Sequence, residues 1–242
     1  MRRKVLMYGG FFLLLVFGFL FFVFKDEDLT KSPLAVINNV QDFSFTNQNG
    51  KTITNQTVEG KVYVVEYFFT TCKGICPKMN ANMRRVFDAY KDEPDFMILS
   101  HSCMPETDSV PLLKAYEEKM IGGKLVKNED GSYKIEYDKN NQQKIVNPNW
   151  NFVTGDKTAL YKMARESYTV DNNKPDSAQL IKDQFIHTQF FRLVDKQGRT
   201  RGQVYDGLKN DEIEQLITDI KGLLKEKVDH PHFMNGFSNN PG

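Results

Sequence analysis

Two scarcities limit what this chain of 242 residues can be. It has only 3 cysteines, which are too few for a fold held together by disulfides. It also has almost no net charge, because 32 basic side chains are matched by 31 acidic ones. That balance leaves no electrostatic footprint for nucleic acid or acidic polymers, so we expect no nucleic-acid partner. The length suffices for one ordinary domain plus attachments.

The sequence contains one long apolar run, near its N-terminus. Val5–Phe24 is free of charge and follows the basic residues Arg2, Arg3 and Lys4. Its length suits a helix that crosses a bilayer. The run ends in FFVFK, where bulky residues stand at the position of a cleavage site, so we interpret residues 1–24 as an uncleaved membrane anchor.

The charges around this anchor predict its orientation. The basic flank indicates that the N-terminus is cytoplasmic and that the main domain lies on the other side of the membrane, in the periplasm or an equivalent compartment. No lipobox-type cysteine follows the run, so a lipid anchor is not indicated. An outside location also permits disulfides.

The most informative stretch is Tyr63–Asn80, YVVEYFFTTCKGICPKMN. An apolar run typical of a strand ends in a loop that holds Cys72 and Cys76, spaced C-x-x-x-C, and Pro77 follows. Proline is tolerated in the first turn of a helix, so we expect a helix to begin near Pro77. The positive end of that helix favours thiolate over thiol. A thiolate pair can exchange with a disulfide or bind a soft metal, and the spacing leaves both open.

Strands and helices alternate through the rest of the chain. The patterns predict strands over 62–69, 96–99, 150–153, 190–194 and 203–205, and helices over 77–90, 109–120, 155–167 and 213–224. Such alternation indicates an α/β fold in which helices cover a central mixed sheet. A cysteine motif at the end of an early strand in this context indicates a thioredoxin-like fold.

Composition shifts mark the domain boundaries. The segments are an anchor at 1–24, a polar tether at 25–38, the thioredoxin-like domain at 39–228 and a disordered tail at 229–242. Residues 121–148 are polar and rich in Lys, Asn, Gln and Gly, so we interpret them as an inserted loop or hairpin.

His187, in FIHTQFF, stands just before a predicted core strand. A lone histidine at a strand edge is more often structural, but beside two cysteines it would complete a set of three metal ligands. Thiolates select Cu(I), and imidazole accommodates both Cu(I) and Cu(II). The spacing does not show that His187 reaches Cys72 and Cys76.

Four segments, FFTTCKGICPKMN, SHSCMPETDS, NFVTGD and IHTQFFRLVDKQGR, resemble the Sco/SenC family over roughly residues 39–228. The resemblance implies a thioredoxin-like, usually membrane-anchored protein that carries copper to cytochrome c oxidase. Carried over residue by residue, the copper ligands of that family fall on Cys72, Cys76 and His187. The implied partner is the copper-receiving subunit of the oxidase, or another copper or thiol protein.

The sequence departs from the family at three places, one of which is the long insertion at 121–148. Ile186 stands where the family often has Asp directly before the histidine, and Asp183 is the nearest acid. Cys103 and Met104 occupy a loop where the family commonly has an aliphatic residue and an acid. Cys103 has two interpretations: a buried thiol at a strand end, or a third thiol that could join the pair in exchange.

Two functions of different class therefore stay open. One is a copper-binding assembly factor that is not an enzyme, and that delivers copper to cytochrome c oxidase or prepares its copper site. The other is an extracytoplasmic thiol–disulfide oxidoreductase that acts on the cysteines of a partner, with Cys72 and Cys76 as catalytic residues. Thioredoxin-type oxidoreductases usually carry C-x-x-C, so the longer spacing here favours metal. Both activities can coexist, since reduction of a partner's cysteines is also attributed to the family.

Overall fold

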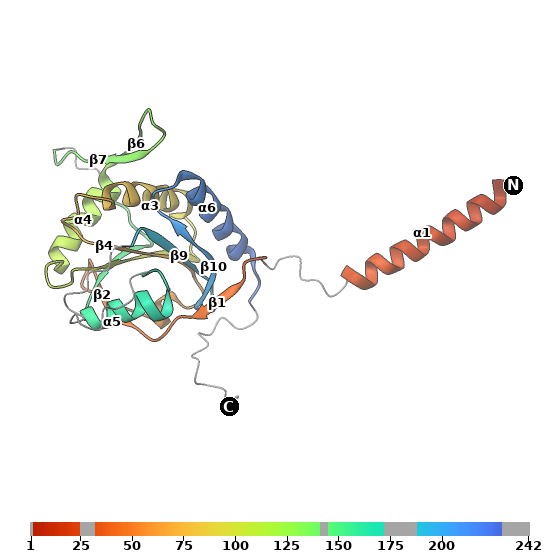
Figure 1. Cartoon of the computed structure of the whole chain (residues 1–242), viewed down its shortest axis with the longest axis horizontal. Coiled ribbons are helices and arrows are strands. Elements are labelled where there is room, and N and C mark those ends of the chain that lie inside the picture. The colour runs from red at the N-terminus through yellow and green to blue at the C-terminus, as the bar shows by residue number, and fades with distance from the viewer. Residues whose placement is uncertain (1, 25–31, 141–144, 172–187, 229–242) are drawn as a thin grey trace. The chain divides into compact units, whose positions relative to one another are not determined.

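The computed structural model describes residues 2–24, 32–140, 145–171 and 188–228, and the chain divides into two units, 1–31 and 32–242. The first unit contains helix α1, Arg2–Phe24 (Figure 1). Its side chains are apolar and exposed over most of its length. By length and composition α1 is a candidate membrane span, as the sequence predicts.

The second unit is built around an eight-stranded sheet in the order β1–β10–β9–β4–β5–β8–β2–β3. The strands are β1 Val36–Asn39, β2 Ser44–Asn47, β3 Thr52–Thr54, β4 Val62–Phe68, β5 Phe96–Ser102, β8 Trp150–Thr154, β9 Phe190–Val194 and β10 Arg199–Asp206. β4, β5 and β8 run parallel to one another, and the remaining pairs are antiparallel. The predicted central mixed sheet is confirmed.

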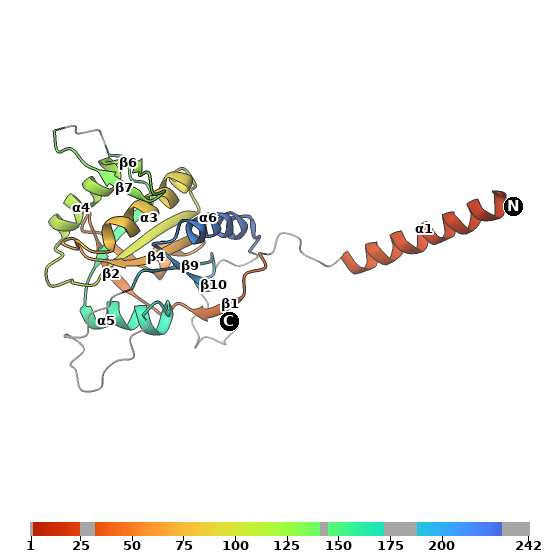
Figure 2. The same ribbon diagram turned by 45° about the horizontal axis from the view of Figure 1, so that its top comes forward.

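Helices cover both faces of this sheet, in the thioredoxin-like α/β arrangement that the sequence predicts. The helices are α2 Asn55–Val58, α3 Cys76–Tyr90, α4 Val110–Gly122, α5 Lys157–Lys162 and α6 Asn210–Lys225. In Figures 1 and 2, α3, α4 and α6 lie over one face and α5 lies over the other. A π-helical turn, η1 Met163–Ser167, continues α5, so the predicted helix over 155–167 is present but changes its winding.

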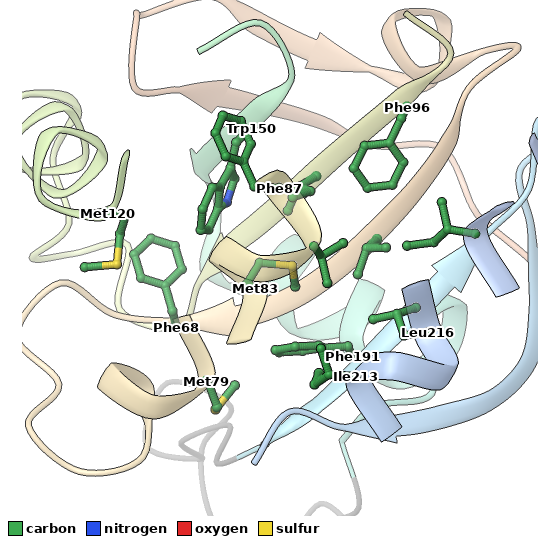
Figure 3. Packing of buried hydrophobic residues seen from close by; sticks show 14 of the residues in the cluster. Phe68, Met79, Met83, Phe87, Phe96, Met120, Trp150, Phe191, Ile213 and Leu216 are labelled. Atoms are coloured by element: carbon green, nitrogen blue, oxygen red, sulfur yellow. The ribbon is translucent and has the colours of Figure 1, made fainter. Parts of the chain in front are cut away.

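The central strand β4 divides the interior into two cores, because successive side chains of a strand point to opposite faces. Val62, Val64 and Phe68 pack into the core beneath α3, α4 and α6. Tyr63, Val65 and Tyr67 pack into the core beneath α5. In the first core, helix α3 contributes residues at helical spacing: Met79, Met83, Val86 and Phe87. Figure 3 shows three of them packed among Trp150, Phe191, Ile213 and Leu216.

The structure differs from the sequence expectations at the edges. Strand β1 lies largely within the stretch expected to be a tether, 25–38, and pairs with β10. Val36 and Ile37 are exposed, so this edge strand lacks the apolar alternation that would reveal it. β10 is longer than the predicted 203–205. Its first half buries the polar residues Thr200 and Arg201, so the apolar pattern of a strand is missing there.

A hairpin forms within the stretch 121–148, which was expected to be an insertion. Helix α4 extends to Gly122, and a separate two-stranded sheet follows, β6 Lys124–Lys127 and β7 Tyr133–Glu136. The guanidinium of Arg85 on α3 stacks over the ring of Tyr133, 4.4 Å from its centroid, which holds the hairpin against α3. The predicted tail, 229–242, lies outside the described residues.

Candidate functional site

The two motif cysteines lie where a strand gives way to a helix. β4 ends at Phe68, and the backbone N–H of Cys72 donates to the carbonyl of Phe69 at 3.2 Å. Cys76 is the first residue of α3, with Pro77 in the first turn. Both thiols are free; Cys72 is half-buried, whereas Cys76 is only 4% exposed. The predicted helix start and the loop position of Cys72 are confirmed.

A cleft of about 290 Å³ opens at this junction. Its walls are the three cysteines Cys72, Cys76 and Cys103, the aromatic residues Tyr67, Phe68 and Phe69, and Lys73, Gly74, Ile75 and Thr188. The lining is therefore mainly apolar around three sulfurs. This is a chemically soft site with little to attract a hard cation.

The histidine expected as third ligand cannot be followed to this cleft, because His187 lies outside the described residues. Thr188, the next residue, lines the cleft. Its hydroxyl donates to the carbonyl of Val170 at 2.6 Å. Among the residues that the structure describes, no group of three or more His, Cys, Asp or Glu side chains could hold a metal ion. The ligand set Cys72, Cys76 and His187 stays a prediction.

Burial raises the pKa of Cys76 well above its ordinary value, and a hydrogen bond to Cys72 and the charge of Cys72 raise it further. A backbone hydrogen bond to Phe69 opposes this shift. The pKa of Cys76 therefore shifts in the direction opposite to the one expected from the helix start, because burial disfavours the charged form.

A buried carboxylate holds the loop that carries Cys72. Asp108 is fully buried and accepts hydrogen bonds from the hydroxyl of Thr70 at 2.6 Å and from that of Ser102 at 2.6 Å. The backbone N–H of Thr70 points to both of its oxygens, at 3.3 Å each. The N-cap of α4 is the next residue, Ser109. No sequence pattern indicates the bond to Thr70, because 38 residues separate the partners.

A second buried carboxyl, Glu66 on β4, belongs to the same region. The hydroxyl of Ser100 donates to Glu66 Oε1 at 2.5 Å, and Trp150 Nε1 donates to that hydroxyl at 2.8 Å. Burial raises the pKa of Glu66 to about 8, and a charge on Glu66 would raise that of Cys76. The sequence analysis missed this residue; an acid inside an otherwise apolar strand run was the available signal.

A protein-family model described as SCO1/SenC matches residues 33–126 and 135–225. The chain belongs to the SCO1/SenC family. The unmatched residues between the two stretches, 127–134, fall in the β6–β7 hairpin.

Individual relatives agree with this assignment. The SCO1 protein homolog of Bacillus subtilis (strain 168) is 29% identical over 205 residues, which is 84% of this Sco-family chain and 91% of the relative. BsSco, a member of the Sco family of cytochrome c oxidase assembly proteins in which a disulfide switch has been identified, is 28% identical. The alignment covers 80% of this chain and 98% of BsSco, with a TM-score of 0.58.

A more distant solved structure has the same fold. ScoI of Bradyrhizobium japonicum, with copper bound, is 21% identical to this Sco-family chain. The alignment covers 77% of this chain and 99% of ScoI, with a TM-score of 0.52.

Proposed function

We propose that this Sco-family protein is a membrane-anchored, copper-binding assembly factor that delivers copper to cytochrome c oxidase or prepares its copper site. The observation that carries the proposal is the pair of free thiols, Cys72 and Cys76, which open onto one apolar cleft. Family membership supports it, as does the description of BsSco as an oxidase assembly protein.

The donor atoms in the cleft suit copper. Two thiolates, from Cys72 and Cys76, are the ligand type that selects Cu(I), and the imidazole of His187 would make a third ligand that also suits Cu(II). A thiol must lose its proton before it ligates, so copper binding would release protons. Because Cys76 is buried with a raised pKa, the cation would offset the cost of its thiolate.

The location that we propose follows from the first unit. α1 would anchor the chain with its N-terminus in the cytoplasm, because the basic residues Arg2, Arg3 and Lys4 precede the span. The second unit would then lie in the periplasm or an equivalent compartment, where copper-receiving partners and disulfide chemistry are both available.

The test is copper binding by the full chain in detergent, with and without each thiol. Cu(II) bound to a thiolate gives a charge-transfer absorption band, and we expect the wild-type protein to show it. Cys72→Ser and Cys76→Ser should lose the band. Cys103→Ala is the matched control, because Cys103 lines the same cleft but is not a proposed ligand. Full retention of the band in Cys72→Ser would refute this assignment.

A second function, thiol–disulfide exchange with a partner protein, is favoured by the unequal exposure of the pair. Cys72 is half-buried and Cys76 almost fully buried, which suits an accessible attacking thiol beside a protected one. Its test is the reduction of an oxidised copper-site peptide that contains two cysteines. Loss of that activity in Cys72→Ser, with no copper bound to wild type, would place exchange ahead of copper delivery.

A further inference from the structure

The third cysteine of the chain belongs to the same cleft as the motif pair. The chain has 3 cysteines in all, and each of them lines the cleft. Cys103 follows the end of β5, whereas Cys72 and Cys76 follow β4, and these two strands are adjacent and parallel. Parallel neighbours end at the same edge of a sheet, so the tertiary structure brings the distant thiol to the pair.

A single peptide unit, Phe68–Phe69, connects Cys103 with Cys76. The backbone N–H of Cys103 donates to the carbonyl of Phe68 at 2.7 Å. The thiol of Cys76 makes a backbone hydrogen bond with Phe69. Cys76 packs into the core beneath α3 and Cys103 into the core beneath α5, and both line the cleft at the end of β4.

Cys103 is held in place and shielded from water. It is 3% exposed, and its carbonyl accepts the hydroxyl of Tyr161 at 2.9 Å. Burial is the main cause of the raised pKa of Cys103. The charge of Cys76 is the next largest cause, followed by the charges of Asp108 and Cys72. The thiols are thus electrostatically coupled. No group of three metal-ligating side chains forms within the described ranges, so we consider covalent exchange rather than three-sulfur metal binding.

We propose that Cys103 is a third redox thiol, which takes over Cys76 from an oxidised Cys72–Cys76 pair to form a buried Cys76–Cys103 disulfide. The pair is first oxidised by a disulfide compound. Cys103 then attacks Cys76 Sγ, and its proton passes to the departing sulfur of Cys72. The Cys103–Cys76 bond forms, the Cys72–Cys76 bond breaks, and Cys72 leaves with the electron pair and takes up a proton. The step needs no further oxidant.

This exchange would give the site a state that the motif pair alone does not have. The disulfide moves to the two most buried thiols, while Cys72, the more exposed one, returns as a free thiol. The pair could not ligate copper in this state, because Cys76 is tied to Cys103. Cys72 would still be able to attack a partner's disulfide. The inference concerns the thiols alone, so it does not depend on copper delivery.

The test follows disulfide linkages in the full, copper-free chain in detergent. Reduced protein is treated with excess oxidised glutathione, quenched with acid, alkylated and mapped by peptide mass spectrometry. In wild type we expect the Cys72–Cys76 link first, then the Cys76–Cys103 link together with renewed alkylation of Cys72. In Cys72→Ser we expect glutathione on Cys76 to be displaced by Cys103, so that both remaining thiols disappear into one link.

Control variants separate exchange from damage to the fold. Cys103→Ala, or Cys103→Val if alanine destabilises the core, should stop at the Cys72–Cys76 link, and Cys72 should never become alkylatable again. The fluorescence of Trp150 and a cooperative thermal transition check that each variant is folded. The proposal is overturned if folded Cys72→Ser keeps a glutathione adduct or two free thiols. A wild-type time course that never contains the Cys76–Cys103 link overturns it equally, without any variant.

Discussion

The hydroxyl of Thr70, two residues before Cys72 in the chain, donates a 2.6 Å hydrogen bond to the carboxylate of Asp108. The same carboxylate accepts the hydroxyl of Ser102 at the end of β5, next to Cys103. One buried group therefore positions both loops that carry the cleft's thiols. It is satisfied by several donors at once, which is how a charge can be buried at acceptable cost.

Removal of the Thr70 hydroxyl should loosen this junction. We expect Thr70→Val to lower the free energy of unfolding by about 1–3 kcal/mol, because the buried carboxylate of Asp108 loses a charge-assisted hydrogen bond. The rate of exchange of Cys72 with a small disulfide should change as well. Thr71→Val is the matched control, since Thr71 is adjacent and exposed, and it should change stability by less than about 0.5 kcal/mol. Urea unfolding measures the stability of each variant. Equal loss of stability in Thr70→Val and Thr71→Val would contradict this role of Asp108.

Glu66 should make stability depend on pH. Its pKa is raised from 4.5 to about 8 in the folded chain, so between these values the folded state holds a proton that the unfolded state has lost. The free energy of unfolding should therefore fall as pH rises from about 4.5 to about 8, and then level off. Glu66→Gln cannot ionise, so it should be more stable than wild type at alkaline pH, with little difference near the lower limit.

The measurement is denaturant unfolding at several pH values, followed by the fluorescence of Trp150, the single tryptophan. Its ring is linked to Glu66 through Ser100, so the folded-state fluorescence of wild type should itself titrate in the same window. The exposed variant Glu129→Gln should keep the wild-type pH profile. A profile for Glu66→Gln that matches wild type at every pH would rule out Glu66 as the source.

The extent of the soluble unit can be tested with two fragments. A fragment that begins at Ser32 keeps β1 and two contacts of the segment just before it. Ser32 N–H donates to Glu226 Oε1 at 2.6 Å, and Arg201 Nε donates to the carbonyl of Leu34 at 3.0 Å. A fragment that begins at Asn39 loses both, together with the pairing of β1 to β10. We expect both to be soluble, with the longer one melting at the higher temperature. Equal melting temperatures would show that β1 adds nothing to the fold.

His187 separates the two proposed functions. Loss of a residue that only supports a metal ligand typically weakens metal binding by about 10- to 100-fold. If His187 is itself a copper ligand, His187→Ala should weaken copper binding by more than this. Disulfide formation between Cys72 and Cys76 should persist, because exchange needs only an accessible thiolate. His230→Ala, in the predicted tail, is the control.

Copper affinity by chelator competition and exchange rate with a small thiol are measured on the same samples of wild type, His187→Ala and His230→Ala. Unchanged copper affinity in His187→Ala would remove the third ligand. Collapse of exchange with copper binding intact would instead assign the imidazole to thiol chemistry.

Sequence reasoning succeeded wherever the signal was local. Helix α3 was predicted from Pro77 and the spacing of Met79, Met83, Val86 and Phe87, all of which depend on neighbours within a few turns. It failed for β1 and the first half of β10, where pairing is made by the backbone and by buried polar residues such as Arg201. Apolar periodicity carries no information about such strands.

The sequence by itself determined the membrane-span candidate, the mixed sheet with its helices, and the display of Cys72 and Cys76 at a strand-to-helix junction, because each follows from patterns within a short stretch of chain. Only the tertiary structure decided the raised pKa of Cys76, the support of the Cys72 loop by Asp108 and the position of Cys103 at the cleft. Desolvation, buried hydrogen bonds and proximity of thiols depend on which distant segments meet, and that is settled by packing rather than by spacing along the chain.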